Sequence, residues 1–234
     1  MRRIVEPELL DELPSTDPRA VGSRADLRRL NVIMRHDAIL LHAFDQHLAQ
    51  PCPASRALRM AELGAGDGTL LLRLARRWSK LGVTAEVTLI DRLDLVSEDT
   101  RRAFTALGWS LETVATDVMT WLEQSSPPVD LMIANLFLHH FSEDALRTLF
   151  RHAAARTNLF VACEPRRSTL ALTASHLLWL IGCNAITRHD AAVSVRAGFL
   201  GHELSALWPS DISWELIEQS AGGFSHCFVA KKNV

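Results

Sequence analysis

Glu62 and three closely spaced glycines stand at the end of an apolar run. The stretch ALRMAELGAGDG places Glu62 just before Gly64, Gly66 and Gly68, and Thr69 with the apolar letters LLLRLA follows at once. This order predicts a strand, a turn whose backbone is free of side chains, and the start of a helix. Such a junction presents backbone N–H groups and a helix N-terminus at the carboxyl edge of a sheet, where nucleotide-like ligands bind.

The spacing of the glycines separates two kinds of nucleotide site. A dinucleotide fingerprint reads G-x-G-x-x-G/A, whereas here the third small residue comes one place early and Thr69 fills the expected position. The Glu62 carboxylate would repel a pyrophosphate, and it suits a cationic ligand better. The alternative is a tight turn without a ligand, which is disfavoured because three glycines cost backbone entropy on folding.

The pattern E-x-G-x-G-x-G resembles motif I of the class I S-adenosylmethionine (SAM) methyltransferases, whose ligand carries a sulfonium and an ammonium group. Farther along, NLFLHHF at residues 135–141 resembles the N-x-x-H-H segment of the ubiquinone/menaquinone-type and related (type 11/12-like) small-molecule methyltransferases. The resemblance covers residues 55–165 well. It implies SAM as cofactor and S-adenosylhomocysteine (SAH) as product.

Strands and helices are expected to alternate after the glycine turn. Strands are predicted at residues 84–90, 109–114, 129–134 and 158–163, and helices at 93–107, 118–123 and 142–155. Repeated strand–helix units imply an α/β fold with a doubly wound parallel sheet. The tail, 212–219 and 224–231, predicts two strands joined through Gly222 and Gly223, and such a hairpin requires an antiparallel strand. This order resembles the Rossmann-like seven-stranded methyltransferase sheet, whose last strand is reversed.

Four segments are expected along the chain. Residues 1–54 form an N-terminal helical lid segment, in which 24–49 show an amphipathic helical pattern. Residues 55–165 form the SAM-binding Rossmann-like core. Residues 166–210 form a helical insertion that serves as a substrate lid, and residues 211–234 form the C-terminal hairpin that completes the sheet.

The resemblance assigns cofactor contacts to the end of each strand. Motif I faces the methionine part of the ligand, an acid after the second strand accepts from the ribose hydroxyls, and the residue after it covers the adenine. An acid and its neighbour after the third strand face the adenine ring, and the residues after the fourth strand lie near the sulfonium. These cofactor-binding residues are Glu62, Gly64, Gly66, Gly68, Asp91, Arg92, Asp117, Val118, Asn135 and Leu136.

Histidines are the candidates for a general base, because the chain has no tyrosine. Methyl transfer is an in-line displacement at the sulfonium methyl carbon, and a hydroxyl acceptor gains from losing its proton to a positioned base. His139 or His140 is the expected base beside the transferred methyl, and the alternative is that both pack the following helix. His189, next to Asp190, is a second catalytic candidate because an adjacent acid orients the ring.

The insertion is expected to select the acceptor. Its nearly apolar stretch at residues 169–186 predicts a helix that is buried or lines an apolar cavity, with a dimer contact as the alternative. His176, Trp179 and Leu180 are the expected substrate-binding residues. An aromatic, phenolic or lipid-tailed acceptor of secondary metabolism, methylated on oxygen, would suit such a lid.

The composition of the chain limits the kinds of binding partner that can be expected. A net charge of −2 favours neither nucleic acid nor a membrane surface as a partner, no apolar stretch is long enough to span a bilayer, and the four cysteines are typical of a reduced, cytoplasmic protein. No metal site is expected, because only Asn135 and two histidines follow the fourth strand. Three alternatives stay open: nitrogen or carbon methylation, a SAM-binding or interaction protein without turnover, and an NAD(P)-linked oxidoreductase. A homodimer is also compatible with this sequence.

Overall fold

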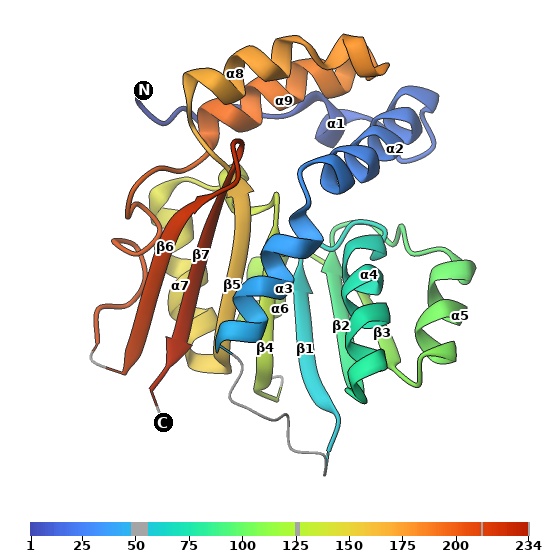
Figure 1. Ribbon diagram of the computed structural model, residues 1–234, viewed down its shortest axis with the longest axis vertical. Coiled ribbons are helices and arrows are strands. Elements are labelled where there is room, and N and C mark those ends of the chain that lie inside the picture. Colours follow the sequence, from blue (N-terminus) through green and yellow to red (C-terminus); the bar gives the residue numbers. More distant parts are fainter. Residues whose placement is uncertain (48–55, 125–126, 212, 234) are drawn as a thin grey trace.

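A seven-stranded sheet forms the centre of the computed structural model, which describes residues 1–47, 56–124, 127–211 and 213–233 (Figure 1). The strand order is β3-β2-β1-β4-β5-β7-β6. β1 to β5 run parallel, and β7 is antiparallel to both of its neighbours. The predicted fold class is therefore confirmed. The strands are β1 (Leu58–Leu63), β2 (Ala85–Asp91), β3 (Ser110–Ala115), β4 (Val129–Asn135), β5 (Thr157–Pro165), β6 (Trp214–Ala221) and β7 (Ser225–Lys232).

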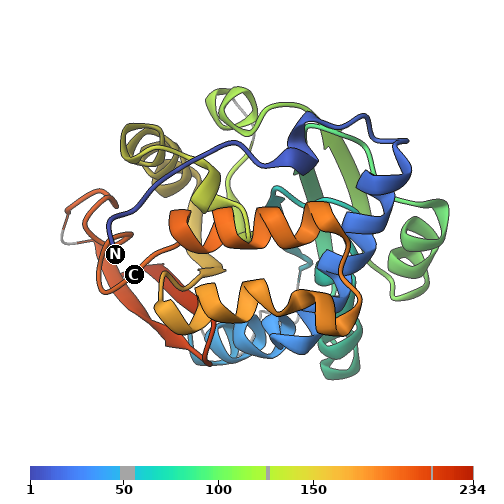
Figure 2. The same ribbon diagram turned by 90° about the horizontal axis from the view of Figure 1, so that it is seen from above.

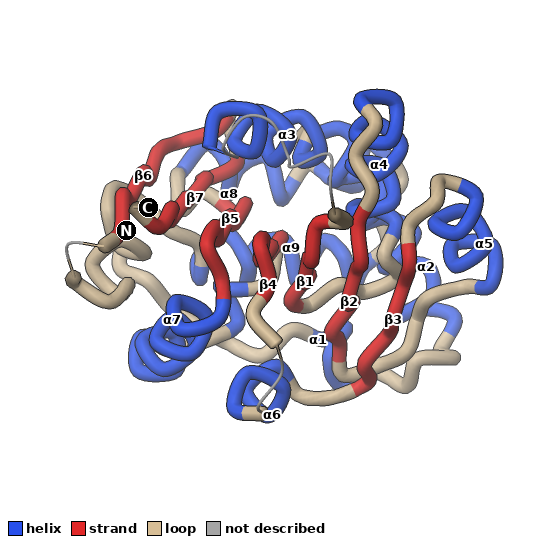
Figure 3. The backbone as a smooth tube through the Cα atoms, turned by 90° about the horizontal axis from the view of Figure 1, so that it is seen from below, coloured by secondary structure: helices blue, strands red, loops and turns tan. Residues whose placement is uncertain are grey.

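Helices cover both faces of the sheet, as the view along the strands shows (Figure 3). One face carries α3 (His36–His47), α4 (Thr69–Trp78) and α5 (Glu98–Ala106), and the other carries α6 (Val118–Glu123) and α7 (Glu143–Arg156). Each face has its own buried apolar cluster. The central strands are buried on both sides, which explains their nearly continuous apolar sequence.

Side-chain caps fix where several of these helices begin. Ser97 caps α5, Asp117 caps α6 and Ser142 caps α7, each by accepting a backbone N–H from the first turn of its helix. α5 is shorter than the predicted 93–107, because its cap lies at Ser97. α4 instead begins after Gly68, whose left-handed backbone (φ 71°) completes the turn from β1.

The N-terminal region differs from the prediction of one helix over 24–49. It contains the single-turn α1 (Leu9–Glu12), then α2 (Pro18–Ile33), and the chain turns at Arg35 (φ 56°) before α3 begins. α3 packs on the sheet, where Leu40 and Phe44 are fully buried, so this part of the predicted lid belongs to the core layer. Residues 48–55, which hold the predicted boundary and Cys52, lie outside the described residues.

The insertion lies across the carboxyl ends of the parallel strands. α8 (Thr169–His176) continues into the short 3-10 helix η3 (Leu178–Ile181), and α9 (Ala185–Ala197) returns beside α8 (Figure 2). The predicted continuous helix over 169–186 is therefore broken after His176 and at Gly182. No helix of the described ranges is long and apolar enough to cross a membrane. Cys163, Cys183 and Cys227 are buried free thiols.

The second and third glycines of the β1–α4 turn allow a stability test. Gly66 (φ 56°) and Gly68 (φ 71°) both have left-handed backbones, which cost an L-residue roughly 1–2 kcal/mol. An added Cβ meets nothing within 4 Å at Gly66 but lies 2.6 Å from Leu89 Cδ1 at Gly68. We expect Gly68→Ala to lower the free energy of unfolding by about 1 kcal/mol more than Gly66→Ala, measured by urea denaturation of ligand-free protein. Equal losses would contradict this packing argument.

Candidate active site

One large cavity opens at the carboxyl ends of β1, β2 and β4. Its volume is about 940 Å³, and its floor is formed by the ends of these strands and the turn before α4. The N-terminal segment (residues 1–17), α2, α8, η3 and α9 supply the walls. This is the crevice in which open α/β sheets bind ligands.

Nine of the ten residues expected to bind the cofactor line this cavity. They come from four different strand ends and yet face one space. Gly68 is the exception, because it packs against Leu89 at the start of α4. The nine residues are Glu62, Gly64, Gly66, Asp91, Arg92, Asp117, Val118, Asn135 and Leu136.

The glycines serve different purposes within the turn. An added Cβ at Gly64 (φ 68°) would lie 2.1 Å from the Phe137 ring, so this position must be glycine for the β4 loop to pack. A Cβ at Gly66 would point into open space, which leaves the backbone there accessible to a ligand. The Gly66 N–H donates to Asp91 Oδ2 over 2.9 Å, which ties the turn to the end of β2.

Glu62 is a buried carboxylate with an unsatisfied oxygen. Its side chain is 2% exposed, and its Oε2 has no hydrogen-bond partner. Burial, with added repulsion from Asp67 and Asp91, raises the pKa of Glu62 to about 8. Asn135 Oδ1 is a second buried acceptor without a partner. Both atoms belong to cavity-lining residues, so the site requires a ligand with hydrogen-bond donors, and preferably a cation.

The acids of β2 and α6 are partly engaged by their own backbones. Asp91 Oδ1 accepts the N–H of Leu93 over 3.0 Å, and Asp117 accepts the N–H of Met119 over 2.8 Å as the α6 cap. Arg92 pairs with Asp11 of the N-terminal segment over 3.2 Å. Asp117 thus caps α6 and also lines the cavity.

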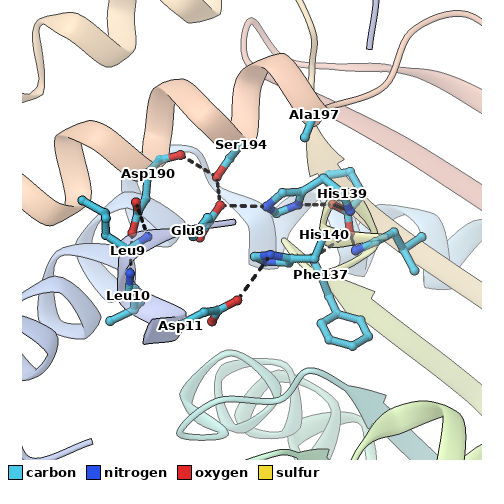
Figure 4. A network of polar contacts seen from close by, with 12 residues as sticks. Glu8, Leu9, Leu10, Asp11, Phe137, His139, His140, Asp190, Ser194 and Ala197 are labelled. Atoms are coloured by element: carbon cyan, nitrogen blue, oxygen red, sulfur yellow. Dashed lines mark hydrogen bonds and ion pairs between the residues drawn. The ribbon is translucent and has the colours of Figure 1, made fainter. Parts of the chain in front are cut away.

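His139 is held between two carboxylates on the acceptor side of the cavity (Figure 4). Its Nδ1 lies 2.8 Å from Glu164 Oε2, and its Nε2 lies 3.3 Å from Glu8 Oε1. Burial alone would lower the pKa of His139, but hydrogen bonds and charge from Glu164 and Glu8 raise it to about 9. At neutral pH this ring is an imidazolium and cannot accept a proton.

His140 has the opposite character. Its ring centroid lies 4.3 Å from that of His139, and its Nδ1 lies 3.7 Å from Asp11 Oδ2. Burial and the positive charge of His139 lower the pKa of His140. The structure therefore places a neutral imidazole in the cavity wall beside a charged one.

Four residues predicted for catalysis or substrate binding do not line the cavity, and these predictions are corrected. The His189 side chain is 51% exposed and lies beside Asp190, whose carboxylate binds the N-terminal segment. His176, Trp179 and Leu180 are exposed on the outer side of α8 and η3. The helix period turns other residues of the insertion inward, namely Ala171, Ala174, Ser175, Leu178, Ile181, Ala191, Ser194 and Val195.

Sequence reasoning missed the polar residues that the N-terminal segment brings to the site. Glu8 and Asp11 line the cavity next to the two histidines, more than 120 residues away in sequence. Glu164, at the end of β5, accepts the N–H groups of Phe137 and Leu138 in the loop after β4. No local pattern in the sequence signals these contacts.

The ligand-capable atoms of Glu8, His139 and His140 lie within 4.8 Å of one another, the one such group among the described residues. A metal would have to displace the proton that His139 shares with its carboxylates. In this structure the Glu8 carboxylate and the His139 ring of this group form an ion pair.

Comparison with known proteins finds similarity to methyltransferases. Residues 60–158 match the methyltransferase domain family. The tRNA1(Val) (adenine(37)-N6)-methyltransferase of Cronobacter sakazakii is 29% identical over 104 residues, which cover 42% of this chain and 37% of that protein.

Two solved structures share the fold. The plantazolicin methyltransferase BamL, in complex with a triazolic desmethylPZN analogue and SAH, aligns with a TM-score of 0.63 and 12% identity, covering 94% of this chain and 93% of that one. An O-methyltransferase family protein from Burkholderia thailandensis aligns with a TM-score of 0.55 and 17% identity, covering 94% and 64%. The chain thus spans less than two thirds of that protein and of the tRNA methyltransferase.

The family match lies on the strands whose ends form the cavity, and the unsatisfied carboxylate and amide oxygens suit a cationic donor. Residues 60–158 therefore match a methyltransferase domain, and the fold is the one that the SAH-bound plantazolicin methyltransferase also has.

Proposed function

We propose that this chain transfers the methyl group of SAM to an oxygen atom of a small hydrophobic or aromatic acceptor. The observation that carries the proposal is His140, a half-buried imidazole with a lowered pKa in the wall of the same cavity that holds the cofactor residues. A neutral imidazole accepts a proton at physiological pH, as the methylation of a hydroxyl requires.

The walls beyond the cofactor residues are mainly apolar. They come from the N-terminal segment, α2, η3, α9 and the β6–β7 turn, and they include Leu10, Leu13, Leu30, Ile33, Met34, Leu178, Ile181, Val195 and Phe224. Ligand pockets of this kind have volumes of about 300–1,000 Å³ and bind through apolar contact with a few polar groups. An apolar molecule with one reactive hydroxyl fits this lining.

The charge of the cavity argues against an anionic acceptor. Its acidic residues outnumber its arginines, and Arg28 and Arg92 already pair with Asp67 and Asp11. The chain also reads Asn-Leu-Phe-Leu after β4, without an N-P-P-Y-type motif. We therefore carry over methyl transfer, and not the tRNA substrate, from the Cronobacter relative. Small molecules are the proposed partners; a cytoplasmic location and a homodimer stay predictions that the structure does not test.

Different residues of the cavity would bind the methyl donor and the acceptor. When bound, SAM supplies an electrophilic methyl group on its sulfonium. Glu62 and Asn135 would hold the cationic donor through their unpaired oxygens, and Asp91 and Asp117 would hold its nucleoside. His140 would take the proton of the acceptor hydroxyl as the new oxygen–carbon bond forms and the sulfur–carbon bond breaks. Alignment of the two reactants supplies much of the rate.

Binding of SAM should release a proton from Glu62. With a pKa of about 8, Glu62 is mostly protonated at pH 7, and a bound cation favours its ionised form. We expect release of about one proton per SAM at pH 7, and affinity that rises with pH up to about 8, measured by calorimetry in buffers of different ionisation enthalpy.

Glu62→Gln should abolish this proton release and weaken SAM binding, while Glu86→Gln, an exposed change on β2, should do neither. If the wild-type protein binds SAM without releasing a proton, Glu62 does not pair with the donor.

His140→Ala should lower turnover by about 10²–10⁴-fold while the Kd for SAM changes less than twofold, because the base acts on the acceptor alone. The assay follows labelled methyl transfer from SAM to para-alkylphenols of increasing chain length, with para-alkylanilines as the nitrogen-acceptor comparison. His202→Ala, on an exposed loop, is the control. Full turnover by His140→Ala, or a preference for anilines, would refute the proposed oxygen chemistry.

Turnover should not depend on a metal. Because the His139 proton occupies the group formed by Glu8, His139 and His140, we expect the same rate with and without EDTA. Loss of turnover in EDTA and its recovery with added Mg²⁺, Mn²⁺ or Zn²⁺ would show that this group holds an ion.

A further inference from the structure

The N-terminal segment is fastened across the acceptor side of the cavity at several points. The Arg3 guanidinium donates to the carbonyls of Ala197 at the end of α9 and Phe141 after β4, each over 2.8 Å. The N–H groups of Leu9 and Leu10 donate to the two carboxylate oxygens of Asp190, each over 2.9 Å. The segment therefore bridges the insertion and the loop after β4.

Glu8 is the most buried residue of this segment. It is 9% exposed, and its Oε1 contacts His139 Nε2 and accepts the Ser194 hydroxyl (Figure 4). Burial raises the pKa of Glu8, but the hydrogen bond and charge of His139 outweigh this effect and lower it. A buried carboxylate of this kind is stable only with a partner of opposite charge.

We propose that Glu8 is a positioning residue of the methyl-transfer reaction: with Glu164 it holds the His139 ring from both sides, and the held ring fixes the place of His140. This inference rests on the proposed function, in which His140 is the base. Glu8 itself touches neither reactant in this account.

The first step of the argument is the orientation of His139. Glu164 Oε1 accepts the N–H groups of Phe137 and Leu138, each over 2.9 Å, so this carboxylate is locked to the loop after β4. Its Oε2 binds His139 Nδ1, which leaves Nε2 as the one free ring nitrogen. Because Glu8 binds that nitrogen, neither rotation nor a ring flip preserves both contacts.

The second step is the effect on His140. The two rings lie 4.3 Å apart between centroids with an interplanar angle of 32°, so the place of one limits the other. The charged side chains that face the pair are Glu8 and Asp11 from the N-terminal segment and Glu164 from β5. Arg3 is also close, but it donates to the backbone carbonyls of His139 and Phe141.

A positioning role predicts a pH dependence that a simple tether does not. The proton of His139 stabilises the folded protein, because the pKa of this ring is about 9 there and 6.5 in the unfolded chain. This stabilisation is complete below pH 6.5 and is lost as the pH rises through about 9 in the wild-type protein. Without the Glu8 charge, His139 loses one of the two partners that raise its pKa, and its proton leaves at lower pH. Loss of a mere tether would instead lower activity equally at every pH.

The test compares Glu8→Gln with wild type over pH 6–10 on the para-alkylphenol that gives the highest rate. We expect the alkaline limb of kcat to move to lower pH, so that activity falls about tenfold at pH 8.5 and less than threefold at pH 6.5. Glu8→Asp keeps the charge but shortens the reach, so it should lower kcat with an alkaline limb close to that of wild type. Glu12→Gln, an exposed change in α1, is the matched control.

Two further measurements separate the possible failures. The Kd for SAM should be unchanged in Glu8→Gln, and NMR titration of the histidine rings should show His139 losing its proton at lower pH than in wild type or Glu12→Gln. A uniform loss of activity at all pH values, or an unshifted His139 titration, would overturn the positioning role. If the wild-type protein methylates no phenol, the proposed function fails, and the NMR titration still decides whether Glu8 and Glu164 hold His139.

Discussion

The Glu164 carboxylate is the interaction on which the acceptor side of this molecule depends. Glu164 belongs to β5 and is fully buried. Its carboxylate binds the backbone of the loop after β4 and also the His139 ring. A buried carboxylate needs such hydrogen bonds, and here they are made to the one loop that must present histidines to the cavity. The same contact fixes the orientation of the His139 ring. Glu8 of the N-terminal segment then binds the other nitrogen of that ring.

In the proposed reaction, two buried carboxylates at the same edge of the sheet would serve the donor and the acceptor. Glu164 is satisfied within the protein, whereas Glu62 on β1 keeps an oxygen without a partner. An unsatisfied buried acceptor destabilises the protein unless a ligand supplies the missing donor. The donor side is therefore incomplete without its ligand, and the acceptor side is organised in advance. This asymmetry suits a reaction in which a cation must bind before a proton is removed from a neutral acceptor.

The meeting of the predicted cofactor residues in one cavity could be expected from sequence, because these residues lie at the ends of strands or directly after them. Parallel strands bring their carboxyl ends to one edge, so Glu62, Asp91, Asp117 and Asn135 converge once the strand order is known. The turn at Arg35 could not be predicted, since neither glycine nor proline marks it. The insertion was predicted to be one helix that is buried, lines an apolar cavity or forms a dimer contact. Its chain breaks into α8 and η3, and Trp179 and Leu180 lie on the exposed side of η3.

The acceptor side eluded prediction for a different reason: its parts meet only through long-range polar contacts. Asp190 binds the backbone of Leu9 and Leu10, and Asp26 of α2 accepts the Asn184 N–H and the Thr187 hydroxyl at the start of α9. These contacts join the N-terminal segment and α2 to the insertion, and none of them involves the β1–α4 turn. A change of wall residue in these segments can therefore alter which acceptor fits while the donor contacts stay in place. The exceptions are the residues that contact the strand ends directly. Arg28 pairs with Asp67, Asp11 pairs with Arg92, and Asn31 accepts from Asn135. Glu8 links this cover to His139, and through His139 to the loop that follows β4.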